Sequence, residues 1–205
     1  MATGFSTICP SALNNDILYN CGVLDVKGFG VEGVIVNRND IDFKSFTSVA
    51  EGSQDVNNFP MKTGTKGYRV QQPANNPFTG TQIEMTAGTY FSTFNKTVSF
   101  LVFAEESDRI PDMLANGEFV VILRKKVIPN NSVLSSFSGY NYLIFGLDCG
   151  LKVSEMTRDF YDDDNHGAWM VTMVEEGAPT STRRLVSTTP GGEETILESL
   201  LEEAE

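Results

Sequence analysis

Few of the residue types that carry out chemistry in proteins occur in this chain. It has one histidine, His166, and three cysteines, Cys9, Cys21 and Cys149, with no CxxC spacing. Zinc takes about four nitrogen or sulfur ligands, and a serine or cysteine nucleophile needs a base oriented beside it. His166 lies in a turn-like segment, 164–167, and no GxSxG elbow accompanies it. The sequence therefore predicts neither a zinc site nor a hydrolase of that type.

The odd number of cysteines does not form a complete disulfide framework. We expect free, reduced thiols at all three positions. A bridge between Cys9 and Cys21 is the alternative, because a short N-terminal loop would bring them together.

Long apolar runs and positive charge are also scarce. No run approaches the roughly 20 residues of a membrane-spanning helix, and the N-terminus lacks the basic-then-apolar order of a signal peptide. We therefore expect a soluble protein made in a cytoplasm, with no membrane span. Lys and Arg number 15 against 27 Asp and Glu, a formal charge of −12 that repels nucleic acid. Direct binding to a DNA backbone is not expected.

What is present points to one β-rich (α+β) domain with additions. The chain has 205 residues, 40% of them hydrophobic, which is enough for one sizeable core. We divide it into an N-terminal arm (1–29), a β-rich domain (30–178), and a C-terminal linker with a short helix (179–205). Period-two patterns and turn residues predict strands at 33–40, 41–46, 82–86, 97–104, 118–126 and 168–174. The segment 140–153 is predicted to be a strand pair or one strand interrupted by a bend or bulge at Gly146 and Gly150.

Two helices are predicted. The first spans 107–117, with Ser107 or Asp108 as the cap, Pro111 in the first turn and Gly117 at the end. The second covers 193–203, beyond a Pro-Gly-Gly break. Its apolar stripe would dock on the body of the protein or on a neighbour, and consists of Ile196, Leu197, Leu200 and Leu201.

A long polar segment, about 50–80, separates the first strands from the rest. It is rich in Gly, Pro, Asn, Gln, Ser and Thr and holds few apolar residues. Such a segment cannot form its own core. We interpret it as a long extended loop or hairpin that gains order against another subunit, with isolated disorder as the alternative.

The densest group of oxygen ligands is an acidic turn that a hard cation such as Ca²⁺ would favour if its carboxylates converged. Three of its residues are consecutive, and the EF-hand spacing and downstream Glu are absent, so a solvated turn is the preferred interpretation. A salt bridge to Arg183 or Arg184 of a neighbouring subunit is the intermediate hypothesis. The turn's acidic residues are Asp159, Asp162, Asp163 and Asp164.

One compact basic run, Arg124, Lys125 and Lys126, ends a predicted strand. Such residues usually mark an exposed edge defended against aggregation, and the alternative is contact with an acidic partner surface. The Gly-rich segment 190–194 carries acids where a phosphate loop needs Lys and Ser or Thr. No pair of carboxylates is singled out for glycoside chemistry, so no catalytic residue and no cofactor are predicted.

Three segments resemble phage tail-tube and tail-ring subunits. They are 119–123, then 142–153 with a G-x-D-x-G-L turn, and 164–173, where an acidic loop leads into G-A-W-x-V-T. The resemblance covers about the last half of the chain and carries no catalytic residue. It implies a β-sandwich or barrel with a flanking helix, whose sheets join those of neighbours into a continuous wall, and loops that contact adjacent rings.

The resemblance also implies a place of action and partners. The protein would form a homo-oligomeric ring, a hexamer or dodecamer, in the tail of a virion assembled in a bacterial cytoplasm. Its neighbours would be tail or portal proteins, and DNA would pass through the channel without specific binding.

The leading functional prediction is therefore a non-enzymatic structural subunit. Open strand edges would be completed by neighbours, and an acidic wall would not retain DNA. The alternatives are a capsid-associated or other virion accessory protein and, third, a carboxylate-dependent glycan hydrolase.

Overall fold

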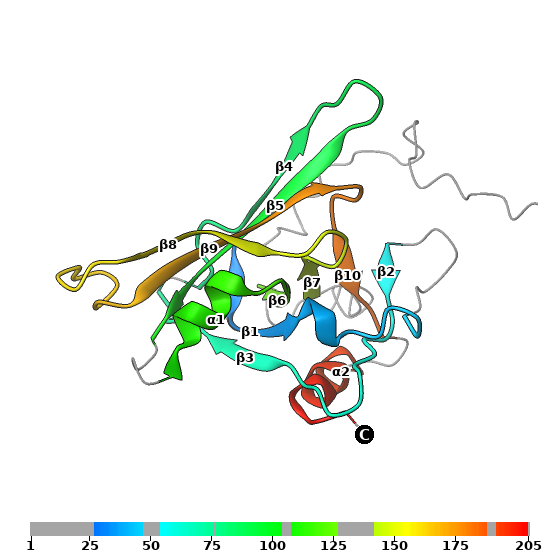
Figure 1. The fold of residues 1–205 in the computed structure, drawn as a ribbon, viewed down its shortest axis with the longest axis horizontal. Coiled ribbons are helices and arrows are strands. Elements are labelled where there is room, and N and C mark those ends of the chain that lie inside the picture. Colours follow the sequence, from blue (N-terminus) through cyan, green and yellow to red (C-terminus); the bar gives the residue numbers. More distant parts are fainter. Residues whose placement is uncertain are drawn as a thin grey trace, which may run out of the picture.

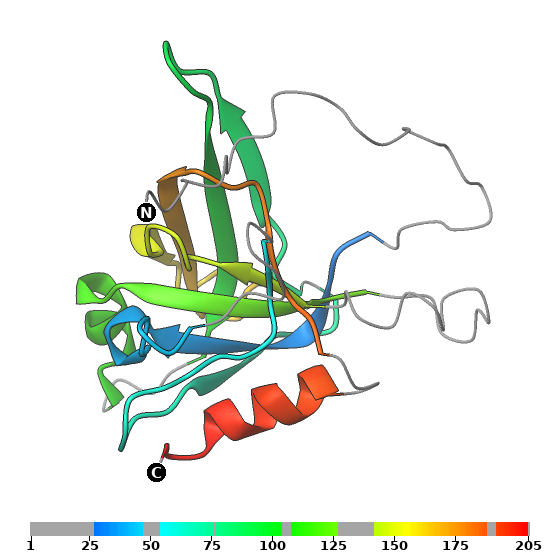
Figure 2. The same ribbon diagram turned by 90° about the vertical axis from the view of Figure 1, so that its right-hand side faces the viewer.

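The computed structural model describes residues 27–46, 54–75, 77–103, 108–126, 142–187 and 192–204. Within them the chain forms three layers: a four-stranded sheet, a six-stranded sheet, and a C-terminal helix packed on the far side of the second sheet (Figures 1 and 2). Almost all of the predicted arm, 1–29, lies outside the described residues, as do Cys9 and Cys21.

The six-stranded sheet is the middle layer and is buried on both faces. Its strands run antiparallel except for the parallel pair β2 and β10. Alternate side chains along a strand point to opposite faces, so Val34 and Val36 face the C-terminal helix while Ile35 faces the other sheet. In order across the sheet, the strands are β2 (Asp55–Val56), β10 (Arg183–Leu185), β7 (Tyr142–Phe145), β6 (Phe119–Lys125), β1 (Phe29–Asn37) and β3 (Tyr68–Gln71).

The four-stranded sheet is fully antiparallel and consists of two hairpins joined through their inner strands. One face packs on the middle layer through residues such as Val98, Phe100, Val171 and Met173. The other face is open to solvent and polar. In order, the strands are β4 (Gln82–Thr86), β5 (Thr93–Val102), β9 (Trp169–Ala178) and β8 (Lys152–Arg158). Figure 1 shows the β4–β5 and β8–β9 hairpins extending from opposite ends of this sheet.

The two α-helices match the predicted segments. Helix α1 (Ile110–Asn116) has Pro111 in its first turn and buries Leu114 in the core between the sheets. The N-cap of α1 is Arg109, in the left-handed conformation and with no side-chain capping hydrogen bond, so the predicted alternative Asp108 is not the N-cap; Ser107 lies outside the described residues. Helix α2 (Gly192–Leu201) lays its predicted apolar stripe on the middle sheet, where Leu200 is 1% exposed. The stripe thus docks on the body of the same chain.

The predicted β-sandwich with a short helix and a C-terminal helix is confirmed, and the described strands do not close into a barrel. The strand predicted at 41–46 is wrong. Asp42 instead forms a turn, because its carboxylate accepts hydrogen bonds from the Lys44 backbone N–H and the Ser45 hydroxyl. The strand predicted at 168–174 is β9, and it lies inside its sheet, between β5 and β8.

The described part of the polar segment 50–80 gains order within its own chain. Strand β2 pairs with β10 and β3 pairs with β1, and Phe59 and Phe78 are buried. A few well-spaced apolar residues therefore anchor a segment whose composition indicates only a loop. Across the described part of the chain, no helix is long and apolar enough to cross a membrane.

Candidate functional site

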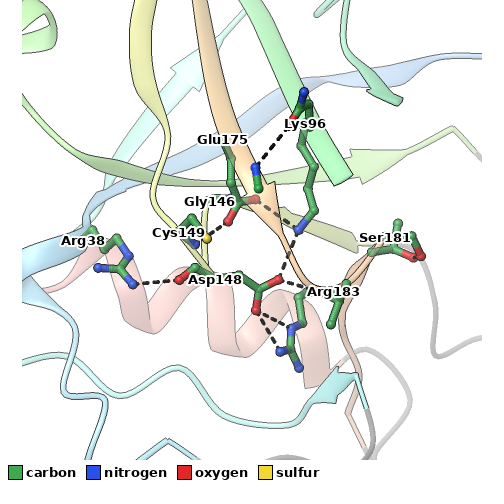
Figure 3. Close-up of polar contacts among 12 residues, drawn as sticks. Arg38, Lys96, Gly146, Asp148, Cys149, Glu175, Ser181 and Arg183 are labelled. Atoms are coloured by element: carbon green, nitrogen blue, oxygen red, sulfur yellow. Dashed lines mark hydrogen bonds and ion pairs between the residues drawn. The ribbon is translucent and has the colours of Figure 1, made fainter. Parts of the chain in front are cut away.

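A buried ionic cluster joins the two sheets at one end of the sandwich (Figure 3). Lys96 on β5 and Glu175 on β9 both occupy core-facing positions, and both side chains are fully buried. The Lys96 Nζ lies 3.1 Å from Oε2 of Glu175 and 3.3 Å from Oδ2 of Asp148, which is 8% exposed. One buried ammonium therefore neutralises part of the charge of two carboxylates.

Asp148 receives donors on both oxygens. Arg183 on β10 donates from Nε at 3.0 Å and from a terminal nitrogen at 2.8 Å to Oδ1. The Thr180 hydroxyl, at 2.6 Å, and Lys96 donate to Oδ2. The cluster of Lys96, Asp148, Glu175, Thr180 and Arg183 thus ties β5 and β9 of one sheet to β10 of the other.

Glu175 also fixes the turn that carries Asp148. Its Oε2 accepts the Gly146 N–H at 3.0 Å, and its Oε1 accepts the Cys149 N–H at 2.7 Å. Gly146 (φ +85°) and Gly150 (φ +84°) both adopt the left-handed region, and a Cβ on Gly146 would lie 2.4 Å from the Phe119 carbonyl oxygen. The G-x-D-x-G-L segment is therefore a turn built to hold the ionic cluster.

The charge state of Asp148 follows from this geometry. Burial acts to raise its pKa, but hydrogen bonds from Arg183 and Thr180 and the charge of Lys96 outweigh burial and lower the pKa. Lys96 lies beside the Asp148 carboxyl group, with Glu175 adjacent, so the cluster contains the amine and the carboxyl group that an amide bond between side chains would need. A carboxylate with four donated hydrogen bonds is stabilised as the anion, however, which opposes attack by an amine. We therefore interpret the cluster as a non-covalent connection between the sheets.

Sequence reasoning found Asp148 only within the turn motif and missed Lys96 and Glu175. The signal was present in the period of the strands. Alternate positions in 94–100 and in 171–175 face the core, and in both strands one of those positions holds a charged residue. Two oppositely charged residues at core-facing positions are expected to pair, since an isolated buried charge is very costly.

The acidic turn predicted as a weak calcium candidate is the β8–β9 connection. Asp162 accepts the N–H groups of Asp164 and Asn165 and the Asn165 side-chain amide, which lowers its pKa. Across the described residues no three His, Cys, Asp or Glu side chains converge to hold a metal ion. Asp162 is thus used to shape the turn.

The two arginines proposed as partners of that turn are engaged inside their own chain. Arg183 binds Asp148, and Arg184 donates to Asp55 from Nε at 2.7 Å and from a terminal nitrogen at 3.0 Å. The second pair links β10 to β2. The hypothesis that these arginines bridge to a neighbour's acidic turn is therefore not supported by their geometry.

The basic run 124–126 lies at the end of β6, which is an inner strand between β7 and β1. Its interpretation as a defended sheet edge is wrong. Arg124 instead forms an ion pair with Glu194 of α2 at 3.3 Å and lies over the Tyr142 ring. The run lines a cavity of about 510 Å³ between α2 and the middle sheet, whose apolar wall includes Leu197 and Leu201.

Cys149 is a free thiol at the surface, as predicted. Partial burial of the thiol raises its pKa, and the negative charges of Glu175 and Asp148 act in the same direction. A thiol with a raised pKa is a poor nucleophile at neutral pH.

Among the described strands, the outer strands of the four-stranded sheet, β4 and β8, each have a sheet neighbour on one side only. They end the sheet on opposite sides. The middle sheet ends in shorter strands, β2 with two residues and β3 with four, and short edges are poor templates for pairing. The four-stranded sheet therefore carries the longest unpaired edges in the described part of the chain.

No known family profile matches this chain, and no curated protein or solved structure is detectably similar to it.

Proposed function

We propose that this chain is a non-enzymatic structural subunit that assembles side by side with copies of itself into a ring or tube, as in a phage tail around a DNA channel. The observation that carries the proposal is that β4 and β8, on opposite sides of one sheet, each have no second partner strand within the described part of the chain. Two different edges that pair give a head-to-tail contact, which closes into a ring when the rotation between copies is suitable.

The strand directions allow the sheet to continue across that contact. Neighbouring strands alternate in direction across the four-stranded sheet, so β4 and β8 run in opposite directions. When copies are placed side by side around an axis, β8 of one copy meets β4 of the next as an antiparallel pair. Repetition then gives one continuous antiparallel wall.

The two edges are also staggered. Gln82 of β4 and Lys152 of β8 lie in one row across the sheet, through the paired residues Thr97 and Val174. From that row β4 and β8 extend toward opposite ends of the sheet. For the edges to overlap fully, the next copy must be displaced by about four residues along the strands. An even displacement keeps the core-facing side chains of both copies on the same face.

This displacement has a geometric consequence for a closed wall. Four residues span about 14 Å along a strand and four strands span about 19 Å across the sheet, so the strands tilt by about 35° from the ring axis. Closed barrels typically tilt by about 35–45°. A displacement of two residues, with the same rise per residue and strand spacing, would give a strand tilt of only about 20°. The stagger therefore suits a closed ring, with Thr86 beside Lys152 and Gln82 beside Thr157 of the next copy.

The inner strand β5 extends past β4, and side chains of the same chain form hydrogen bonds with its backbone groups there. The buried Gln72 amide donates to the Leu101 carbonyl at 2.8 Å and accepts the Leu101 N–H at 2.7 Å, and Thr81 accepts the Ser99 N–H at 3.4 Å. Own-chain contacts thus cover this stretch of β5 and leave β4 as the edge on that side.

The solvent face of the sheet suits a wall past which DNA moves. Its charged residues are Glu84, Glu155 and Glu176 against one cation, Lys152, by the alternation of the strands. Each cation facing a channel would add a salt-dependent phosphate contact. A mainly acidic and hydroxyl-rich face minimises such contacts.

The test is a cysteine pair at the proposed junction, Thr86→Cys/Lys152→Cys, in the full chain. Mild oxidation should give a ladder of covalent oligomers on a denaturing gel, and negative-stain microscopy should show rings. The control, Thr86→Cys/Glu176→Cys, carries its second cysteine on the same face of an inner strand and should give no ladder. A protein that stays monomeric at high concentration and gives no ladder would contradict the proposal and favour an accessory role on another lattice.

A further inference from the structure

The exposed hydrophobic side chains gather at the two ends of the four-stranded sheet. Of the twelve large ones among the described residues, seven lie at these ends and two more, Ile110 and Met113, lie on α1, which packs beside β8. Apolar residues gathered at exposed sites indicate a contact surface. At the β4–β5 end they are Met85, Tyr90 and Phe91; at the other end they are Phe103, Phe160, Tyr161 and Met170.

The β4–β5 tip, residues 87–92, presents its aromatic residues on a tight turn. Tyr90 is 94% exposed and Phe91 is 65% exposed. A Cβ on Gly88 would lie 2.3 Å from the Phe91 carbonyl oxygen, so the turn requires glycine there. Tyrosine on a pre-organised turn is a frequent anchor of protein interfaces, because it buries much area at little cost in side-chain entropy.

The β8–β9 tip, residues 159–168, is aromatic but also acidic. Tyr161 is 95% exposed, and the Arg158 guanidinium covers one face of the Phe160 ring at 4.3 Å. The β8–β9 tip contains four aspartates, whereas the β4–β5 tip contains no charged residue. Two β8–β9 tips would repel each other, but an uncharged tip and an acidic tip would not. This charge pattern opposes contact between two β8–β9 ends and is compatible with contact between unlike ends.

We propose that the β4–β5 tip of one copy docks on the β8–β9 end of a second copy in the next ring, with Tyr90 and Phe91 packed among Phe103, Phe160, Tyr161 and Met170. The contact is head-to-tail along the strand direction and stacks rings into a tube. The proposal rests on the lateral assembly proposed above, because the rings are what it stacks. The two hairpins extend from opposite ends of the sheet (Figure 1), whereas the lateral contact uses its side edges. The axial contact between tips and the lateral contact between β4 and β8 therefore do not compete.

The first experiment compares the full-length wild type with Tyr90→Ser/Phe91→Ser by negative-stain microscopy and sedimentation velocity. We expect stacked rings from the wild type and single rings from the variant, with the Thr86→Cys/Lys152→Cys ladder retained in both backgrounds. The matched control is Tyr68→Ser, which removes a half-exposed aromatic side chain from β3 and should leave stacking unchanged.

The second experiment tests polarity with Tyr90→Cys/Tyr161→Cys. Oxidation should extend covalent products beyond dimers, while Tyr90→Cys alone should give no more dimer than the wild type. Efficient dimers from Tyr90→Cys alone would show tip-to-tip contact and overturn the proposal. It is also overturned if wild-type rings never stack, or if Tyr90→Ser/Phe91→Ser stacks as well as the wild type. Absence of the ladder from Thr86→Cys/Lys152→Cys in the otherwise wild-type protein is a separate result, which contradicts the ring itself.

Discussion

Lys96 on β5 and Glu175 on β9 form a fully buried ion pair, with the lysine Nζ 3.1 Å from Oε2 of the glutamate. They are paired directly across two adjacent strands. The Glu175 carboxylate also accepts the Gly146 and Cys149 N–H groups of the β7–β8 turn. The glutamate that pairs with Lys96 in the core therefore also fixes the turn that carries Asp148.

Replacing Lys96 should destabilise the fold strongly. Lys96→Met leaves Glu175 and Asp148 with less compensation in a buried site, and the free energy of unfolding should fall by about 3–5 kcal/mol. Urea denaturation followed by tryptophan fluorescence measures it. The control, Lys152→Met, removes a 69%-exposed lysine and should change stability by about 0.5 kcal/mol or less. Equal effects of the two substitutions would contradict the structural role of the cluster.

The stabilisation that Asp148 provides should disappear in acid. Its pKa is lower in the folded protein than in the unfolded chain, so its contribution is present above the ordinary aspartate value of about 4 and is lost as the pH falls through the folded value. Asp148→Asn should be clearly less stable than the wild type at pH 7, and the gap should narrow below about pH 4. Urea midpoints across this range measure the gap, and a constant gap would refute the assignment.

Lys96 and Asp148 should remain unlinked. Because Asp148 is held as a carboxylate by Arg183, Thr180 and Lys96 itself, no amide should form between the two side chains. Intact-mass spectrometry of the purified protein should give the mass of the full sequence. A loss of one water molecule that disappears in Lys96→Met would show a covalent bond instead.

Gly146 should tolerate no side chain. Gly146→Ala combines a positive φ with a Cβ 2.4 Å from the Phe119 carbonyl oxygen, so it should cost well over 1 kcal/mol, the scale of the backbone strain alone. Gly177→Ala is a matched comparison, because φ is +70° there but nothing lies within 4 Å, and its cost should be about 1 kcal/mol. Thermal unfolding of both variants tests this difference.

The proposed junction between copies places Glu84 beside Glu155. Like charges directly opposite across two strands destabilise the pair, by up to about 1 kcal/mol. Glu84→Lys should therefore lower the protein concentration at which rings form, measured by light scattering, and the effect should weaken in high salt. Glu176→Lys adds the same charge to an inner strand and should have a smaller effect. A Glu84→Lys variant that assembles less readily would count against this register.

Much of the secondary structure was predictable from the sequence, and the segments that were predicted wrongly or missed have identifiable physical causes. The strands 82–86 and 118–126 and both helices were found because apolar periodicity and Pro or Gly breaks are local signals. The segment 41–46 alternates like a strand, but the Asp42 side chain provides turn hydrogen bonds that the alternation does not reveal. Strands β2 and β3 are short and polar, and their pairing depends on partners more than 30 residues away in the sequence.

The sequence alone determined that the chain is β-rich and has an amphipathic helix near 193–203, because the spacing of apolar side chains is a local signal in most of the strands and in that helix. Only the tertiary structure decided which charges meet and which edges stay open. Lys96, Asp148 and Glu175 come together from distant parts of the chain, and strand order depends on long-range pairing that local sequence does not encode. The turn motif 146–151 was visible in the sequence, but its purpose became clear only when Glu175 and Arg183 were found beside it.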